Sequence, residues 1–206
     1  MKIAIIGAGN VGSAVGLAWS SAGHDVIWGV RGGPGRYPLL PTAQLAEPSA
    51  AIAGADVIVL ATPWPATEAA IASLGDLAGR IIVDTTNPLR MGADGLELSL
   101  GYETSAGELV AVWAAGARVF KTLNQTGAEN MAEARRYATP PVMFVAGDDD
   151  AAKPTVMTLV RDLGFEPLDG GPLRTARLLE PYAMLWIEQA LKRGQGPAFA
   201  FAIERR

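Results

Sequence analysis

Along the chain, short apolar runs alternate with longer amphipathic stretches. Strand-like apolar runs occur at residues 3–6, 25–30, 56–61, 81–84, 118–122 and 142–146. Helix-compatible stretches occur at residues 11–22, 48–53, 66–74, 105–115 and 151–163. Strands that are apolar at nearly every position are typical of a parallel sheet covered on both faces. The pattern therefore predicts an α/β fold of the Rossmann type, with a doubly wound, mainly parallel sheet and helices on both faces.

The length of 206 residues fits a single domain over residues 1–206. We expect residues 1–146 to form its core and residues 147–206 to form a short C-terminal α/β extension. A last helix is predicted at residues 181–192, with one face toward the core or toward a partner in a homodimer. Two stretches rich in Gly and Pro, residues 32–38 and 87–103, are predicted to be loops at the carboxyl edge of the sheet, where such folds bind ligands.

The composition narrows the class of partner. The formal net charge of −4 provides no basic face for a phosphate backbone, so nucleic acid is not an expected partner. The chain has no cysteine, which excludes disulfides and thiolate chemistry, and no apolar run reaches the roughly 20 residues that span a bilayer. The apolar run at residues 1–6 is too short for a signal peptide. We expect a cytoplasmic protein that binds small molecules and has no membrane partner.

The clearest motif lies between the first strand and the first helix. The sequence Gly7-Ala8-Gly9-Asn10-Val11-Gly12 has the glycine spacing of a dinucleotide-binding loop in the position that the mechanism requires. Gly7 would permit a tight turn, Gly9 would leave room for the pyrophosphate, and Gly12 would let the helix pack closely on the strand. The backbone N–H groups at the start of the helix would face the phosphate charge.

The residues after the second strand indicate which dinucleotide binds. NAD sites usually place Asp or Glu there to accept hydrogen bonds from the ribose 2′-hydroxyl, whereas this chain has Gly29-Val30-Arg31. A guanidinium can pair with a 2′-phosphate through two charge-assisted hydrogen bonds. Arg31 therefore favours NADP(H). Arg36 is either a second phosphate ligand or a free surface arginine.

The following strand ends provide candidates for the nicotinamide end. Thr62 and Pro63 follow the strand at residues 56–61 and are placed to line the ribose or the nicotinamide ring. Trp64 could cover the nicotinamide or its partner ring, or pack as an aromatic at a helix start. Asn87, which precedes a proline, could hydrogen-bond a carboxamide or initiate a turn.

Several motifs together resemble the deazaflavin (coenzyme F420)-dependent NADP oxidoreductases, which are related to the oxidoreductase domain of the six-transmembrane metalloreductases. The resemblance covers nearly the whole chain. It rests on Gly7–Gly12, Arg31, Thr62-Pro63-Trp64, Lys121-Thr122-Leu123-Asn124, Gly147-Asp148-Asp149-Asp150, and Pro167–Leu173 leading into Ala176–Glu180.

The resemblance implies an enzyme in which a hydride passes directly between the nicotinamide C4 of NADP(H) and the carbon at position five of a deazaflavin. No acid, base or metal is required, so we expect no catalytic side chain and no metal ligand. Asp148, Asp149 and Asp150 precede a predicted helix and are interpreted as structural, because carboxylates there bind free N–H groups. The single histidine, His24, is expected to be an exposed turn residue.

Two departures from the family pattern affect the expected site. Val30 stands where family members can have a serine beside the 2′-phosphate, which leaves more of that binding to Arg31. The stretch Lys121–Gln125 is more similar to the metalloreductase branch, so a flavin is an alternative to coenzyme F420 as the second substrate. Lys121 and Asn124 are candidate contacts of the nicotinamide or of its redox partner. Lys121 could equally be a solvated charge at a strand end.

Two other functions remain open at this point. An NADP-dependent reductase of small keto or imino compounds, of the pyrroline-carboxylate reductase or β-hydroxyacid dehydrogenase kind, would be expected to have a long helical C-terminal domain after the Rossmann fold. A non-catalytic NADP-binding sensor would leave the same sequence features, because direct hydride transfer requires no catalytic signature.

Overall fold

A computed structural model describes residues 1–32 and 34–206. The strands are β1 (Lys2–Ile6), β2 (Asp25–Gly29), β3 (Leu45–Ala46), β4 (Val57–Leu60), β5 (Ile81–Asp84), β6 (Leu89–Gly92), β7 (Gly95–Leu98), β8 (Arg118–Lys121), β9 (Val142–Gly147) and β10 (Glu166–Gly171). The helices are α1 (Asn10–Ser21), α2 (Pro48–Ala51), α3 (Trp64–Ala72), α4 (Ala106–Trp113), α5 (Ala128–Glu133), α6 (Lys153–Asp162) and α7 (Ala176–Leu191). Short 3₁₀ turns are η1 (Pro34–Arg36), η2 (Thr42–Gln44), η3 (Ala134–Arg136) and η4 (Leu173–Thr175).

The main sheet has the strand order β10-β9-β8-β5-β4-β1-β2-β3. Its strands pair in parallel except for β8 and β9, which are antiparallel. From β1 the chain builds outward through β2 to β3, and from β4 it builds in the other direction through β5 to β8. The order therefore reverses between β1 and β4, which confirms the predicted doubly wound, mainly parallel Rossmann-type sheet.

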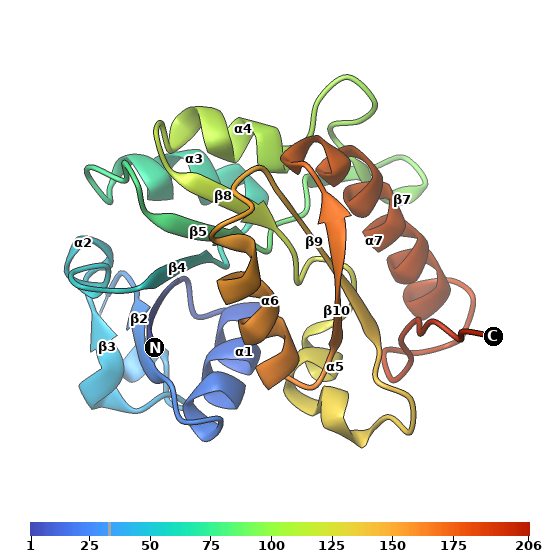
Figure 1. Cartoon of the computed structure of the whole chain (residues 1–206), viewed down its shortest axis with the longest axis horizontal. Helices are drawn as coiled ribbons and strands as arrows, with labels where there is room; N and C mark the ends of the chain where they lie inside the picture. The colour runs from blue at the N-terminus through green and yellow to red at the C-terminus, as the bar shows by residue number, and fades with distance from the viewer. Residues whose placement is uncertain (33) are drawn as a thin grey trace.

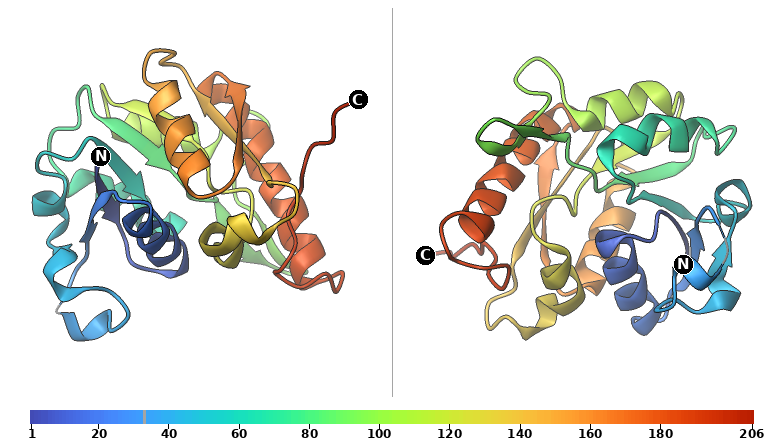
Figure 2. Two further views of the ribbon diagram at one scale, coloured as in Figure 1. Left: turned by 60° about the horizontal axis from the view of Figure 1, so that its bottom comes forward. Right: turned by 180° about the vertical axis from the view of Figure 1, so that it is seen from behind.

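The two faces of the sheet have separate hydrophobic cores. In β1, Ile3 and Ile5 belong to the core under α1, α5 and α6, whereas Ala4 and Ile6 belong to the core under α2, α3 and α4. This alternation follows the two-residue period of a strand, and it explains why these strands are apolar at every position. Figure 1 shows α1 and α6 in front of the sheet, and the right panel of Figure 2 shows α3 and α4 on the opposite face.

Local sequence signals account for several helix starts. Ser105 precedes α4, and its hydroxyl oxygen accepts the Glu108 N–H at 3.2 Å and donates to the Glu108 carboxylate at 2.8 Å. The Ser-x-x-Glu sequence is that of a capping box, but here the Glu108 carboxylate accepts from the Ser105 hydroxyl instead of the Ser105 backbone N–H. Helices α2, α3 and α6 each have proline in their first two positions, where its missing N–H is no loss.

The C-terminal residues pack on the same sheet as the rest of the chain. Strand β10 extends the sheet beyond β9, and α7 lies along that end, beside β7 (Figure 1). The indole N–H of Trp19 on α1 donates to the carbonyl of Leu159 on α6 at 2.9 Å. The N–H of Val142 donates to the carbonyl of Phe201 at 2.9 Å, which ties the C-terminal tail to the start of β9.

Two expectations about the elements are corrected by the structure. The loop predicted at residues 87–103 contains the antiparallel hairpin β6–β7, whose two-residue turn at residues 93–94 is followed by Gly95 with a φ of 112°. The last helix begins at Ala176 instead of Pro181. Its first turns pack on η4 and α4, and this packing compensates for the backbone hydrogen bond that Pro181 cannot donate. The predicted loop at residues 32–38 contains η1, and its Gly33 lies outside the described residues.

Within residues 1–32 and 34–206, none of the helices combines the length and the apolar character needed to cross a membrane.

Candidate functional site

A cavity of about 910 Å³ lies at the carboxyl edge of the sheet. It extends over the ends of four neighbouring strands in the order β2, β1, β4 and β5, across the point where the strand order reverses. Carboxyl ends of parallel strands converge at such a point, which is where doubly wound folds bind ligands. Of the predicted site residues, the structure brings Gly7 to Val11, Arg31, Arg36, Thr62, Pro63, Trp64 and Asn87 to the wall of this one cavity.

The glycine loop has the shape that a pyrophosphate requires. Gly7 has a φ of 109°, and a Cβ on it would lie 2.5 Å from the carbonyl oxygen of Ala61. A Cβ on Gly12 would collide with the carbonyl oxygen of Gly7. A Cβ on Gly9, in contrast, would have no described atom within 4 Å, so this position faces open space in the cavity. The loop thus has tight backbone contacts on its inner side and leaves its outer side open for a ligand at the start of α1.

Sequence reasoning missed Trp28, which holds α1 at its short distance from the sheet. Its indole N–H donates to the carbonyl of Gly12 at 2.9 Å, and its side chain is fully buried. A Cβ on Gly16 would collide with the Trp28 ring. The signal for this contact is the pair Gly12 and Gly16 on one face of the helix, which permits close packing.

The two candidate phosphate ligands lie at the β2 end of the cavity. Arg31 and Arg36 both line it, and both are exposed. The hydroxyl of Tyr37 donates to the carbonyl of Arg31 at 3.1 Å, which ties the loop after η1 back onto the end of β2. Val30 is buried and belongs to the core, so it provides no hydroxyl at this end. The arrangement gives the cavity a positively charged end that suits a phosphate.

The residues after β4 form the middle of the cavity wall. The hydroxyls of Thr62 and Thr67 lie 2.9 Å apart, and Thr67 also donates to the carbonyl of Pro63 at 3.2 Å. The packing interpretation of Trp64 is confirmed, and its contact with a cofactor ring stays a prediction. Trp64 lines the cavity, and its ring also packs against Trp113 of α4, with centroids 5.2 Å apart and an angle of 31° between the planes.

The β5 end of the cavity is lined by neutral groups, namely Thr85, Thr86, Asn87 and Leu89. The Asn87 side-chain amide donates to the carbonyl of Asn124 at 2.8 Å, and the Asn87 side-chain oxygen accepts from the Asn124 amide at 3.0 Å. Asn124 is 3% exposed and is not among the residues that line the cavity. The structure therefore places Asn124 behind Asn87 and not in the wall of the cavity.

The structure corrects the expectations for Lys121. Its side chain is fully buried, so it is neither a solvated charge nor part of the cavity wall. Its ammonium group lies 2.9 Å from a carboxylate oxygen of Asp84 and 3.1 Å from one of Glu180. Burial disfavours the charged form of Lys121, but the two carboxylates outweigh this effect and raise its pKa above the ordinary value. Sequence patterns did not identify Asp84 or Glu180, because no local signal pairs residues so far apart.

The acidic residues before α6 have structural contacts, in line with their interpretation. Asp149 accepts the Ala152 N–H at 2.9 Å, and Asp148 accepts the Leu173 N–H at 2.9 Å. Asp150 is exposed and lies 3.5 Å from the Lys153 ammonium group.

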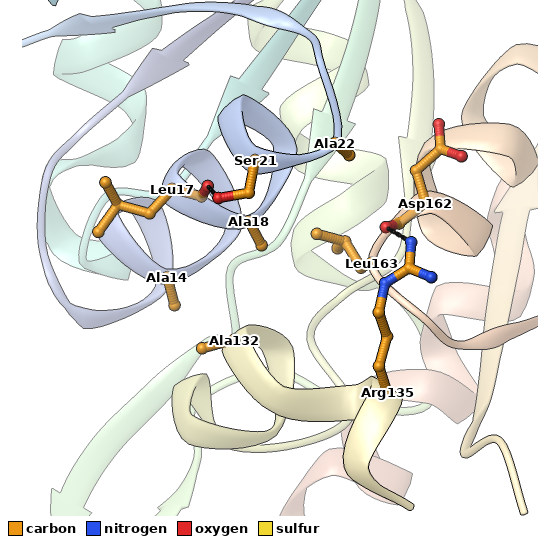
Figure 3. Close-up of a pocket in the computed structure, with 9 residues that line it drawn as sticks. All are labelled: Ala14, Leu17, Ala18, Ser21, Ala22, Ala132, Arg135, Asp162 and Leu163. Carbon is orange, nitrogen blue, oxygen red and sulfur yellow. Dashed lines mark hydrogen bonds between the residues drawn. The ribbon is translucent and has the colours of Figure 1, made fainter.

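A second hollow of about 410 Å³ lies between α1, α5 and the end of α6 (Figure 3). Its polar groups already have partners: Ser21 donates to the carbonyl of Leu17 at 2.9 Å, and Arg135 donates to that of Asp162 at 2.7 Å. The Asp162 carboxylate also lies 3.0 Å from the His24 ring, whose side chain is only 10% exposed. The expectation that His24 is an exposed turn residue was therefore wrong, because α6 packs against that turn.

The fold and the glycine-lined cavity define a dinucleotide-binding protein of the Rossmann type. Comparison with known proteins identifies the family. The family model for coenzyme F420-dependent NADP oxidoreductases matches residues 2–88. A candidate F420-dependent NADP reductase from Arthrobacter sp. FB24 has a crystal structure that is similar over the full length of both chains, with 34% sequence identity and a TM-score of 0.88. The chain belongs to the F420-dependent NADP oxidoreductase family, which confirms the resemblance seen in the sequence.

Two further relatives extend the comparison. Metalloreductase STEAP3 from Rattus norvegicus is 30% identical over 181 residues, which are 87% of this chain and 36% of the relative, so the chain spans about a third of that protein's length. A reductive aminase from Aspergillus terreus has 22% identity and a TM-score of 0.66, over 91% of this chain and 59% of the aminase, and this likeness shows the fold alone. By its family the chain is an NADP-dependent oxidoreductase.

Proposed function

We propose that this protein transfers a hydride directly between NADP(H) and a deazaflavin coenzyme of the F420 type, or a flavin in its place. The proposal rests on one observation, which is the distribution of chemical groups along the cavity. Among its described lining residues, the titratable side chains are Arg31, Arg36 and Tyr37, all at the β2 end. The β5 end is lined by hydroxyl, amide and alkyl groups. This gradient supports one direction for NADP(H), with its 2′-phosphate toward the β2 end.

In the proposed orientation, Arg31 and Arg36 bind the 2′-phosphate, and the pyrophosphate occupies the open space at Gly9. The backbone N–H groups at the start of α1 face its charge. NADP(H) supplies a hydride at the nicotinamide C4, and the protein's task is to hold a second flat ring against it.

The remaining residues act on the nicotinamide half. Thr62 and Pro63 line its path between the ends of β1 and β4. Trp64, supported by Trp113, limits the cavity on the α3 side. Asn87 offers both a donor and an acceptor at the β5 end, which match the carboxamide of the nicotinamide. Hydride transfer leaves an anionic reduced ring, which can take its proton at a ring nitrogen from solvent instead of from a protein group, so the neutral wall at this end suits it.

Stopped-flow absorbance tests this function. Purified protein is mixed with NADPH and, separately, with coenzyme F420, FMN, FAD, a ferric chelate, a keto acid and a cyclic imine. We expect rapid loss of the NADPH absorbance with F420 or with a flavin, and much slower loss when NADH replaces NADPH. Turnover of the keto acid or imine alone would contradict the proposal, and NADPH binding without oxidation by any acceptor would favour a sensor.

A further inference from the structure

The segment that follows β8, residues 121–125, is polar but buried. Lys121 and Thr122 are fully buried, and Asn124 and Gln125 are 3% and 2% exposed. Leu123 has a φ of 58°, in the left-handed region that a leucine rarely adopts. Within the described residues, the hydroxyl of Thr122 has no hydrogen-bond partner. A strained residue and an unpaired buried hydroxyl persist only where the surrounding structure imposes the conformation.

Both ends of this segment are firmly held. At its start, the Lys121 ammonium group binds the carboxylates of Asp84 and Glu180 and donates to the carbonyl of Thr86 at 2.5 Å. At its end, Gln125 makes two hydrogen bonds with the backbone of Phe144 on β9. The Gln125 amide donates to the Phe144 carbonyl at 3.0 Å, and its side-chain oxygen accepts the Phe144 N–H at 3.0 Å.

The turn at Leu123 directs Asn124 toward Asn87. Asn124 contributes one donor and one acceptor to Asn87, as described above, and its side-chain amide also donates to the carbonyl of Leu179 on α7 at 3.3 Å. Its own side-chain oxygen accepts from Gln125 at 3.2 Å. The side-chain amide of Asn124 that faces Asn87 is therefore held by further contacts of the Asn124 side chain.

These two hydrogen bonds permit only one orientation of the Asn87 carboxamide. If the carboxamide flipped, its oxygen would face the Asn124 carbonyl and its amide would face the Asn124 amide, so both contacts would become repulsive. In the observed orientation, Asn124 engages one N–H and one oxygen lone pair of Asn87. A carboxamide has two N–H groups and two lone pairs, so one of each remains for the cavity that Asn87 lines.

We propose that Asn124 is a positioning residue that acts through Asn87, by locking the carboxamide of Asn87 in the orientation that meets the nicotinamide end of NADP(H). The nicotinamide part of this proposal rests on the proposed function. Asn124 itself does not touch the cofactor. The strain at Leu123 is the means by which the chain brings Asn124 behind the cavity wall.

The ligand-free protein provides the first test, by NMR of side-chain amide groups. In the wild type, the two amide protons of Asn87 should give dispersed signals that are absent from Asn87→Ala. Asn124→Ala keeps the backbone carbonyl that accepts from the Asn87 amide and removes the side-chain amide that donates to the Asn87 oxygen, so these signals should shift toward the positions of an unrestrained amide. Asn130→Ala is the matched control, because Asn130 is equally buried at 3% and bonds Thr126, Tyr137 and Phe199, but does not line the cavity. Unchanged Asn87 signals in Asn124→Ala would overturn the proposal.

The second test is a double-mutant cycle of Asn87 and Asn124 in which binding affinities are measured. The two ligands are NADPH and adenosine 2′,5′-bisphosphate, which lacks the nicotinamide half. We expect Asn124→Ala to weaken NADPH about tenfold and to leave the bisphosphate unchanged. Asn87→Ala should cause at least this loss, and the double variant should lose no more than Asn87→Ala alone, because Asn124 acts only through Asn87. Equal losses for both ligands, or additive losses in the double variant, would overturn the proposal.

The two tests separate this proposal from the proposed function. If wild-type protein binds NADPH no more tightly than the bisphosphate, the nicotinamide half makes no contact, and the proposed orientation of the cofactor fails. The part of the inference that concerns the nicotinamide then fails with it, while the NMR comparison still decides whether Asn124 fixes Asn87.

Discussion

The three glycines of the loop after β1 differ in what a methyl group would meet at each position. At Gly7 and Gly12 it would meet backbone atoms, whereas at Gly9 it would project into the cavity. The glycines of the loop therefore have two different roles, although the sequence pattern does not distinguish them. Gly7 and Gly12 make the fold possible, and Gly9 keeps the space that we assign to the pyrophosphate.

This difference predicts that one alanine substitution mainly lowers stability and that another mainly weakens NADPH binding. Gly12→Ala should lower the free energy of unfolding by about 3 kcal/mol, because the backbone must move to admit the methyl group. Gly9→Ala should cost about 1 kcal/mol or less, since Gly9 has extended backbone angles at the N-cap. It should nevertheless weaken NADPH by about tenfold or more. Urea unfolding and fluorescence titration measure the two quantities, and unimpaired binding by Gly9→Ala would contradict the assignment.

The choice of dinucleotide is a second prediction at this scale. Arg31→Glu should weaken NADPH about a hundredfold and change NADH binding little, because a carboxylate replaces the charged donor to the 2′-phosphate. Arg161→Glu, at an exposed position on α6, makes the same change in net charge away from the cavity and should alter neither affinity. Equal affinities of the wild type for NADPH and NADH would contradict the role of Arg31.

At the scale of elements, α7 is joined to α4 by a bidentate ion pair. The Arg177 guanidinium contacts the two carboxylate oxygens of Glu108 at 2.8 and 2.7 Å, and both side chains are about a quarter exposed. The hydrogen bonds from Arg177 are the main reason that the pKa of Glu108 lies below its ordinary value of 4.5. Ionised Glu108 is thus favoured in the folded state.

This shift predicts the direction of a pH effect. Because the pKa is lower in the folded state, the pair stabilises the protein fully above the unfolded-state pKa and loses this contribution as pH falls through the folded-state pKa. Arg177→Gln should therefore be less stable than the wild type at neutral pH, and the difference should shrink at a pH well below 4.5. Urea midpoints at the two pH values measure it.

Arg136→Gln provides the control for this measurement. Arg136 pairs with Glu133 on the surface, with side chains 76% and 50% exposed, so its removal should change stability little at either pH. A stability difference for Arg177→Gln that is the same at both pH values would show that the pair contributes by packing rather than by charge.

The helices and strands also show which parts of the fold could be predicted from the sequence. The apolar runs of the central sheet were identified to within one or two residues, because each strand is buried on both faces and needs no partner to be recognised. The hairpin β6–β7 was missed although Asp94-Gly95 is a turn signal, since its strands are half-exposed and short. The start of α7 was misplaced because tertiary packing extends the helix beyond Pro181.

The candidate site, like the fold, was predictable only where local sequence signals specify it. The loop at Gly7–Gly12 and the strand-end residues Arg31, Thr62 and Asn87 are local signals that one topology brings together. The contacts of Lys121 and Asn124 were not predictable, because their partners lie in β5, just after β5 and in α7, all distant in sequence.

At the scale of the whole molecule, the C-terminal extension completes the sheet and supports the cavity from behind. Strands β9 and β10, the Trp19–Leu159 hydrogen bond and the Lys121–Glu180 ion pair connect residues 147–206 to the rest of the chain. We therefore propose that residues 1–206 fold as one cooperative domain.

Scanning calorimetry tests this proposal. We expect a single transition whose calorimetric and van't Hoff enthalpies agree, and NADPH at a hundred times its dissociation constant should add about 2.7 kcal/mol of stability to the whole molecule. Two transitions, of which only one responds to NADPH, would instead show that the extension is a separate unit.

The most direct test of the proposed chemistry follows a labelled hydride. NADPH that carries deuterium at the nicotinamide C4, on one face or the other, is mixed with oxidised coenzyme F420 and the protein, and the reduced deazaflavin is analysed by mass spectrometry. Direct transfer between the two rings predicts that the deuterium from one face appears at the carbon at position five of the deazaflavin, with a slower rate for that isotopologue. Reduced deazaflavin that contains no deuterium from either face, or no reduction of F420 or of a flavin while NADPH is bound, would contradict the account.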